Sequence, residues 1–196
     1  MDTRLRKLVG LLLGVITATF LLSRMNRLIY GPPPSTLLAL QNSATRLILQ
    51  LPDEHIALPL LSVRVSQIRD TWQARRSGRR RHEGQDIFAP IGTPVYSATN
   101  GILIQKGDAG KGGNAVSVLG PGGRVYYYAH LAGFAQSLCV GDKVTSETLI
   151  GFVGTTGNAR GTPAHLHFGV YGFTGAINPL PLLTNRPRTA APDANL

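Results

Sequence analysis

The sequence predicts a mainly β protein whose body is an antiparallel sheet or a barrel-like sandwich. Glycine and proline occupy 23 and 13 of the 196 positions, and they separate short runs rich in Val, Ile and Tyr. After Trp72 no apolar pattern of helical period and length is visible. Short strands between turn residues are typical of antiparallel domains. With 43% hydrophobic and 15% charged residues, the chain is too apolar for a disordered protein.

Residues 1–30 are expected to form an N-terminal membrane helix. Leu8–Leu22 carry no charge and follow Arg4, Arg6 and Lys7. This run is shorter than the ~17–25 residues of a full span, but flanking arginines can snorkel to the interface. No small-x-small cleavage pattern follows it. We therefore expect an uncleaved, single-pass anchor in the cytoplasmic membrane, with the rest of the chain outside the cytoplasm, on the periplasmic face. The alternative is a secreted protein with a cleaved signal peptide.

Residues 31–59 are expected to be a linker that carries a short stalk or packing helix. The run Gly31-Pro32-Pro33-Pro34 breaks any preceding helix. Ser35 is a suitable N-cap for the next helix, and Pro52 ends that segment.

From residue 60 to residue 183 the pattern changes to short strands, and this segment is expected to be the functional domain. The expected strands are Pro94–Ala98, Gly101–Gln105, Asn114–Leu119, Arg124–His130, Leu149–Val153 and His165–Tyr171. Residues 184–196 are expected to be a disordered tail.

The charge and cysteine content exclude several classes of protein. The formal net charge is +10, yet the basic residues gather around the N-terminal apolar run and between Arg75 and Arg81. No helix shows a basic stripe with interleaved aromatic residues, so no nucleic-acid partner is expected. The single cysteine, Cys139, excludes an internal disulfide framework and a cysteine metal cluster.

The first candidate site is His82-Glu83-Gly84-Gln85-Asp86, which leads into an apolar run. A helical zinc-protease motif would need a histidine in place of Asp86, and Gly84 disfavours a helix. On a loop that enters a strand, the imidazole of His82 and the carboxylate of Asp86 can still meet at one ion. Taken alone, the motif is more typical of a surface histidine beside a turn aspartate.

The second candidate site is the strand that begins Ala164-His165-Leu166-His167-Phe168. Side chains alternate along a strand, so His165 and His167 share a face, and Leu166 and Phe168 point to the opposite layer. A third strand contributes His130, which the same alternation places on the face of Tyr126 and Tyr128.

Together these residues predict a catalytic zinc site. Such a site has three protein ligands and one open position, and His82, Asp86 and one histidine of the His165–His167 pair would supply the three. The other histidine and His130 would then handle protons. The ion would lower the pKa of bound water from 15.7 to about 7.

Three segments closely resemble the lysostaphin/LytM-type zinc metallopeptidases in order and spacing. They are HEGQDIFAPIGTPVYSATNG, VYYYAHL and GTTGNARGTPAHLHFGVY, within a stretch from about Val63 to Leu183. The resemblance implies the duplicated hybrid motif fold, an antiparallel β body with a long groove. It also implies one zinc ion bound by His82, Asp86 and His167, with His165 and His130 as the catalytic pair.

Most members of that family cut cross-link or bridge peptides in bacterial peptidoglycan. The resemblance therefore implies a zinc metalloendopeptidase whose partners are peptidoglycan peptides. With the anchor expected from residues 1–30, the enzyme would be membrane-anchored, and the lipid bilayer would be a second partner. Relatives that have lost metal ligands activate cell-wall amidases instead, so a non-catalytic wall-binding or amidase-activating module is the alternative. This chain retains all five of the family's site positions.

Two further residues are candidates for substrate contact. Asn158 lies in the segment that resembles the family's groove-edge loop. Arg81 ends the arginine run, which either meets carboxylates of stem peptides or forms a solvated loop.

Overall fold

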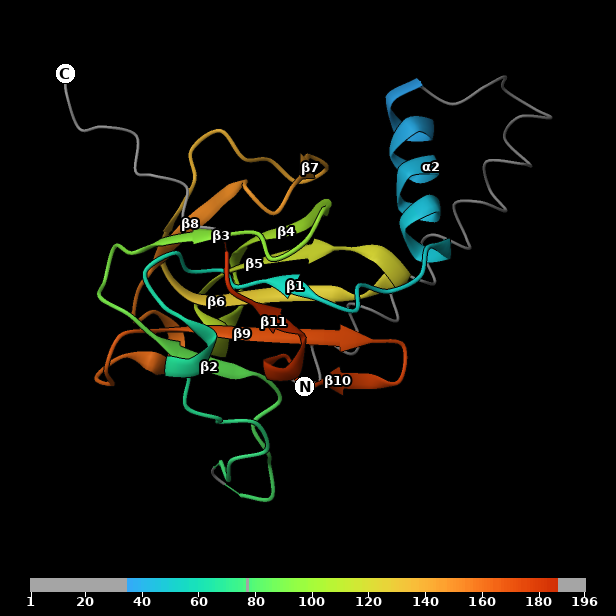
Figure 1. The fold of residues 1–196 in the computed structure, drawn as a ribbon. Coiled ribbons are helices and arrows are strands. Elements are labelled where there is room, and N and C mark those ends of the chain that lie inside the picture. The colour runs from blue at the N-terminus through green and yellow to red at the C-terminus, as the bar shows by residue number, and fades with distance from the viewer. Residues whose placement is uncertain (1–34, 77, 187–196) are drawn as a thin grey trace.

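The structure is a computed structural model that describes residues 35–76 and 78–186. The membrane helix expected in residues 1–30 and residues 187–196 of the expected tail lie outside these ranges. Within the described ranges, no helix is both long and apolar enough to cross a bilayer. Figure 1 shows a β body with helix α2 (Ser35–Leu49) standing beside one end of it.

The body is a nine-stranded sheet in which every pairing is antiparallel. Its strands are β2 (Gln85–Phe88), β3 (Pro94–Tyr96), β4 (Gly101–Asp108), β5 (Asn114–Leu119), β6 (Val125–Phe134), β7 (Lys143–Val144), β8 (Leu149–Val153), β9 (His165–Gly172) and β10 (Gly175–Ile177). The continuous order is β10-β9-β6-β5-β4-β7; β2 pairs with β9, and β8 pairs with β6 and β3. The mainly β, antiparallel prediction is confirmed. The barrel-like form is wrong, because no pairing among the described residues closes the sheet.

Strand β6 changes partner at His130. Its first half, Val125–Ala129, pairs with β9, whereas its second half, Leu131–Phe134, pairs with β8 (Figure 1). Against β5, the two residues Ala129 and His130 lie opposite the single residue Ala115, which makes a β-bulge. The bulge lets one long strand serve two parts of the sheet.

The bulge also reverses the direction of the His130 side chain. Tyr126 and Tyr128 are fully buried in the main core, where the Tyr128 ring lies 5.2 Å from that of Phe168. The His130 ring instead lies 5.0 Å from the ring of His165, on the opposite face. The expected shared face of His130 with the two tyrosines is therefore wrong. The cause is the extra residue and a φ of 64° at His130, which non-glycine residues seldom adopt.

The segments on either side of the expected domain are part of its core. Strand β1 (Ile56–Ala57) pairs in parallel with β11 (Leu183–Thr184), and Leu58 is fully buried. Arg186 donates a hydrogen bond to the Leu58 carbonyl at 2.6 Å. Residues 52–60 are thus more than a linker, and residues 184–186 are ordered. A local pattern could not reveal this, because Leu58 and Arg186 are 128 residues apart in the chain.

Helix α2 occupies the segment expected to be helical, and it packs on the body. Its side chains Ala44 and Leu47 contact a small apolar cluster made of Leu119, Val125 and Tyr171.

Truncation of Leu58 tests whether the β1 segment belongs to the core. Leu58→Ala should lower the free energy of unfolding by about 2–5 kcal/mol, because it empties a fully packed position. Leu61→Ala is the matched control; Leu61 is 52% exposed, and its loss should cost less than about 0.5 kcal/mol. Urea unfolding measures both. Equal losses of unfolding free energy in the two variants would show that the β1 segment lies outside the core.

Candidate metal centre

The antiparallel pairing of β2 with β9 brings the two main motifs together. Asp86 lies directly opposite His167, and Phe88 lies opposite His165. Directly opposed residues share a face of the sheet. His82 precedes β2 and reaches the same place, so residues 81 to 85 positions apart in the chain meet at one point.

Three potential ligand atoms form a nearly equilateral triangle. His82 Nε2 lies 3.1 Å from Asp86 Oδ1 and 2.9 Å from His167 Nδ1, and the third side, from His167 Nδ1 to Asp86 Oδ1, is 3.0 Å. Ligands about 2.0–2.1 Å from a tetrahedral zinc ion are spaced by roughly 3.3 Å. The two imidazoles and one carboxylate are also the donor types of catalytic zinc sites. The residues present therefore fit a zinc ion.

Thr71 holds both ligands of the first motif. Its carbonyl faces His82 Nδ1 at 2.7 Å, and its hydroxyl accepts the Asp86 N–H at 2.9 Å. Its own N–H donates to the Gln85 side chain, which is fully buried. No sequence pattern points to Thr71, because it lies outside the motif and acts mainly through its backbone carbonyl and N–H groups.

Three of the four histidines in the cluster are fixed by backbone carbonyls. Nδ1 of His82 faces the carbonyl of Thr71, Nδ1 of His130 faces that of Thr156 at 2.9 Å, and Nδ1 of His165 faces that of Pro163 at 2.8 Å. A carbonyl oxygen only accepts, so each Nδ1 carries the proton. In neutral rings the Nε2 atoms then keep their lone pairs, ready to bind a metal or a proton.

Burial and neighbouring charges set the protonation of the cluster. Burial lowers the pKa of His130 to about 4, assisted by His167 and His165, so its ring is neutral at neutral pH. Burial also lowers the pKa of His167. Burial alone would raise the pKa of Asp86, but hydrogen bonds with His167 and His82 outweigh it and hold that pKa well below its usual range. The site therefore offers a carboxylate at Asp86 and neutral imidazoles at His130 and His167.

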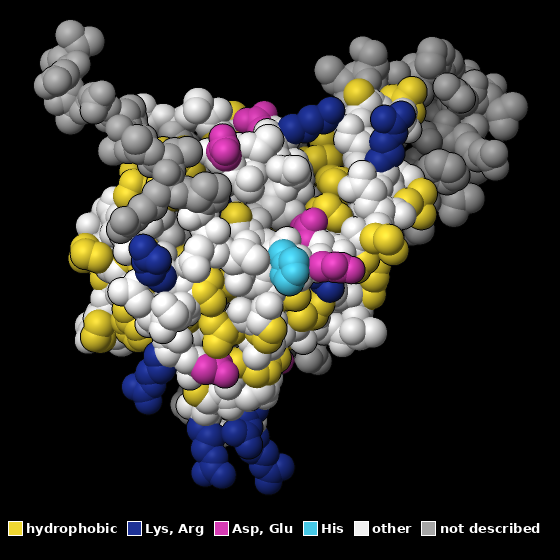
Figure 2. Space-filling view, in the orientation of Figure 1, with side chains coloured by type: hydrophobic (Ala, Val, Ile, Leu, Met, Phe, Trp, Pro, Cys, Tyr) yellow, Lys and Arg dark blue, Asp and Glu magenta, His cyan; other side chains and the backbone are white. Residues whose placement is uncertain are grey.

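Arg76 is a contact of the cluster that the sequence analysis did not single out. Its Nη2 lies 2.7 Å from Asp86 Oδ2, the oxygen that does not face the histidines. Arg76 comes from a hairpin in which Arg75 bridges Arg81. Figure 2 shows basic side chains gathered at the lower end of the molecule, over the loop that precedes β2. The run was visible in the sequence, but only the fold shows which arginine reaches Asp86.

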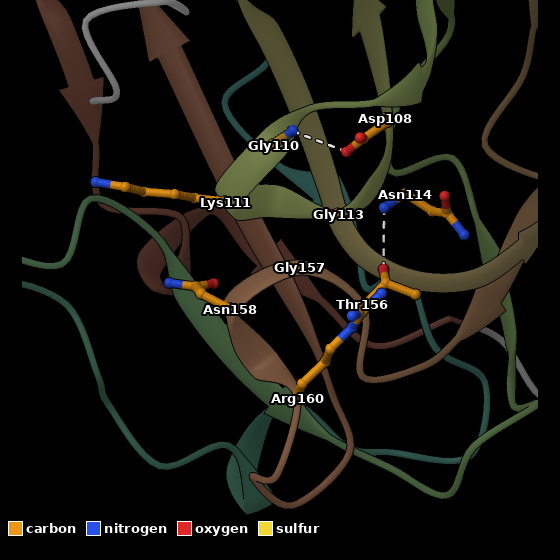
Figure 3. Close-up of a pocket in the computed structure, with 9 residues that line it drawn as sticks. All are labelled: Asp108, Gly110, Lys111, Gly113, Asn114, Thr156, Gly157, Asn158 and Arg160. Carbon is orange, nitrogen blue, oxygen red and sulfur yellow. Dashed lines mark hydrogen bonds between the residues drawn. The ribbon is translucent and has the colours of Figure 1, made fainter.

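The two predicted substrate contacts lie at different places. Arg81 donates a hydrogen bond to the Gln73 carbonyl at 3.3 Å, on the arginine hairpin, and its contact with substrate stays a prediction. Asn158 is exposed and lines a cavity beside Thr156, the residue whose carbonyl holds His130 (Figure 3).

Known proteins share this domain. The chain is 40% identical over 110 residues to the L-Ala–D-Glu endopeptidase of Bacillus subtilis (strain 168), a match that covers 53% of this chain and 34% of that protein. It is 35% identical over 130 residues to the DD-carboxypeptidase/endopeptidase Mpg of Neisseria meningitidis serogroup B, covering 66% and 27%. The chain thus spans about a third or less of the length of these relatives.

The fold is shared as well. The catalytic domain of the antimicrobial peptidase lysostaphin from Staphylococcus simulans matches with a TM-score of 0.53 and 29% identity, covering 60% of this chain and 92% of that domain. Residues 80–179, about half of the chain, match peptidase family M23, and this range contains all five residues of the metal and catalytic cluster. The chain belongs to peptidase family M23.

Proposed function

We propose that this protein is a zinc-dependent endopeptidase that hydrolyses peptide bonds in bacterial peptidoglycan. The observation that carries the proposal is the ligand triangle of His82, Asp86 and His167, with the rings of two further histidines beside it. A module that only binds the cell wall needs neither an open metal position nor imidazoles with free Nε2 atoms.

One zinc ion per chain would be held by His82 Nε2, Asp86 Oδ1 and His167 Nδ1. Zinc in such a set supplies Lewis acidity, which lowers the pKa of water to about 7 and polarises a carbonyl group. Arg76 forms its ion pair with Asp86 Oδ2, so Oδ1 is the oxygen that faces the histidines and would bind the metal.

The remaining histidines handle the protons. His165 Nε2 lies 3.8 Å from Asp86 Oδ1, at the edge of the ligand set, and the His130 ring packs edge-on against that of His165. Each ring is anchored through Nδ1, so Nε2 is the atom that takes a proton from the attacking water. The protonated ring can then donate to the oxygen that gains charge or to the departing amine.

The substrate class rests on relatives in family M23. Several are named as endopeptidases, among them the L-Ala–D-Glu endopeptidase, Mpg and a glycyl-glycine endopeptidase. Peptidoglycan peptides are the substrate class that we infer for this chain from those names.

We also propose that the chain is held at the cytoplasmic membrane with this domain on the periplasmic face. The support is the uncharged run Leu8–Leu22, an apolar segment of the kind that directs export of the chain that follows it. A tether at the membrane surface would keep the enzyme facing the wall.

Incubation of the purified chain with peptidoglycan sacculi tests the proposed activity. We expect cross-linked muropeptides to be cut, the loss to stop with a chelator and to return with added zinc, as read by mass spectrometry. Zinc binding without cleavage would redirect the search to another peptide substrate. A protein that neither binds zinc nor cuts sacculi would instead be a binding module.

Two histidine variants separate metal binding from proton transfer. His82→Ala should lose both zinc and activity, because it removes a ligand. His165→Ala should keep zinc and lower kcat by about 10²–10⁴-fold, the usual contribution of a general acid–base. His55→Ala, at an exposed histidine outside the cluster, is the control. Zinc content by atomic absorption and turnover are measured together; normal turnover in His165→Ala would refute its role.

Arg76→Gln tests the contact with Asp86. Removal of a partner that orients a metal ligand commonly lowers metal affinity by 10–100-fold, and we expect a loss in that range. Arg79→Gln, on the same hairpin, should leave zinc affinity within about twofold of the unchanged protein, as expected for an exposed side chain away from special features. Competition with a zinc-binding dye measures affinity without relying on turnover. Equal affinities in the two variants would show that Arg76 is dispensable for the metal site.

A further inference from the structure

A polar cavity lies beside the histidine cluster, between the turn at residues 108–114 and the loop at residues 156–160. Its volume is about 660 Å³, within the range of sites that hold small ligands. Its lining residues are Asp108, Gly110, Lys111, Gly113, Asn114, Thr156, Gly157, Asn158 and Arg160 (Figure 3).

Thr156 belongs both to the wall of this cavity and to the support of His130. Its carbonyl faces His130 Nδ1 at 2.9 Å, and its hydroxyl accepts the Asn114 N–H at 2.9 Å and donates to the Leu131 carbonyl. Thr156 therefore links the wall of the cavity to the His130 ring, through Nδ1.

A backbone contact between two glycines joins the two walls. A Cβ atom at Gly113 would lie 2.3 Å from the Gly157 nitrogen, and one at Gly157 would lie 2.3 Å from the Gly113 nitrogen. Both residues also have positive φ, of 61° and 66°. The walls are thus fixed to each other, and the side chains around them are held at a set spacing.

The charged groups of the cavity favour an anion. Lys111 and Arg160 are its two cations, and neither forms a salt bridge among the described residues. The one acidic residue, Asp108, already accepts a hydrogen bond from the Gly110 N–H at 2.8 Å. Figure 3 shows Lys111 and Asn158 extending from opposite walls toward the same side, while Arg160 points toward Thr156.

We propose that this cavity is a specificity subsite for a free carboxylate of the substrate peptide, within one or two residues of the scissile bond. This inference rests on the proposed endopeptidase function and goes beyond it by naming the group that is recognised. The guanidinium of Arg160 matches a carboxylate with two parallel hydrogen bonds. Lys111 and Asn158 extend to another side of the cavity, where Lys111 adds to its positive charge.

Two synthetic peptide substrates that differ only in this group test the proposal. One carries the free carboxylate next to the scissile bond, and the other carries a carboxamide there. We expect the unchanged enzyme to prefer the carboxylate by about tenfold or more in kcat/KM, mainly through KM, as for a hydrogen bond to a charged group. Raising the salt concentration should reduce this preference.

Variants of the cations assign the preference to the cavity. Arg160→Gln should abolish most of the discrimination between the two peptides. Arg160→Glu should favour a peptide with an amine at that position. Lys143→Gln, at an exposed lysine on β7, is the matched control and should discriminate as the unchanged enzyme does.

Equilibrium binding keeps this test separate from that of the proposed function. The same two peptides are bound to His165→Ala, which should retain zinc but turn over slowly, and affinity is read by fluorescence anisotropy. Cleavage of both peptides at equal rates, or equal affinities, would overturn the subsite while the endopeptidase stands. Preferential binding of the carboxylate peptide without any cleavage by the unchanged protein would support the subsite and contradict the function.

Discussion

The register between strands β2 and β9 is the constraint on which the site depends. Asp86 lies opposite His167 in this register, and a shift of either strand by one residue would turn every side chain of that strand to the other face. Gly84 contributes to the same fit, because a Cβ atom there would lie 2.5 Å from the His167 ring. Leu166 and Phe168 lie in the core on the opposite face, so hydrophobic burial fixes the register that the metal site requires.

The site also requires the His130 ring to lie beside the other histidines, and a strained backbone at His130 puts it there. Regular alternation along β6 would bury His130 with Tyr126 and Tyr128. The bulge and the positive φ at His130 bring its ring instead beside those of His165 and His167. Residues in sparsely populated backbone regions persist where the surroundings hold them, and they gather at functional sites. Here β8, β9 and the carbonyl of Thr156 provide that support.

The limits of prediction from sequence follow from distance along the chain. Strands such as Asn114–Leu119 and Leu149–Val153 have the predicted bounds, because short apolar runs between turn residues are local signals. The residues of the candidate metal centre are visible because each lies in a compact motif. Thr71 and Arg76 were missed since their roles exist only through hydrogen bonds across the fold. The β1–β11 pair was missed for the same reason, and the bulge at His130 has no signature in residue type.

A few hydrogen bonds are enough to orient the imidazoles of the site before metal or substrate binds. In His82, His130 and His165, Nδ1 donates a hydrogen bond to a backbone carbonyl. Because that backbone is held in a sheet or a tight loop, it moves little. Their Nε2 atoms are therefore fixed in position before any substrate arrives, and in the neutral rings Nδ1 is the protonated nitrogen. His167 differs, because its Nδ1 faces Asp86, whose other oxygen is held by Arg76. The one histidine of the cluster whose ring lacks a backbone anchor is thus positioned by a charge pair, in which Arg76 is the most exposed member of an otherwise buried arrangement.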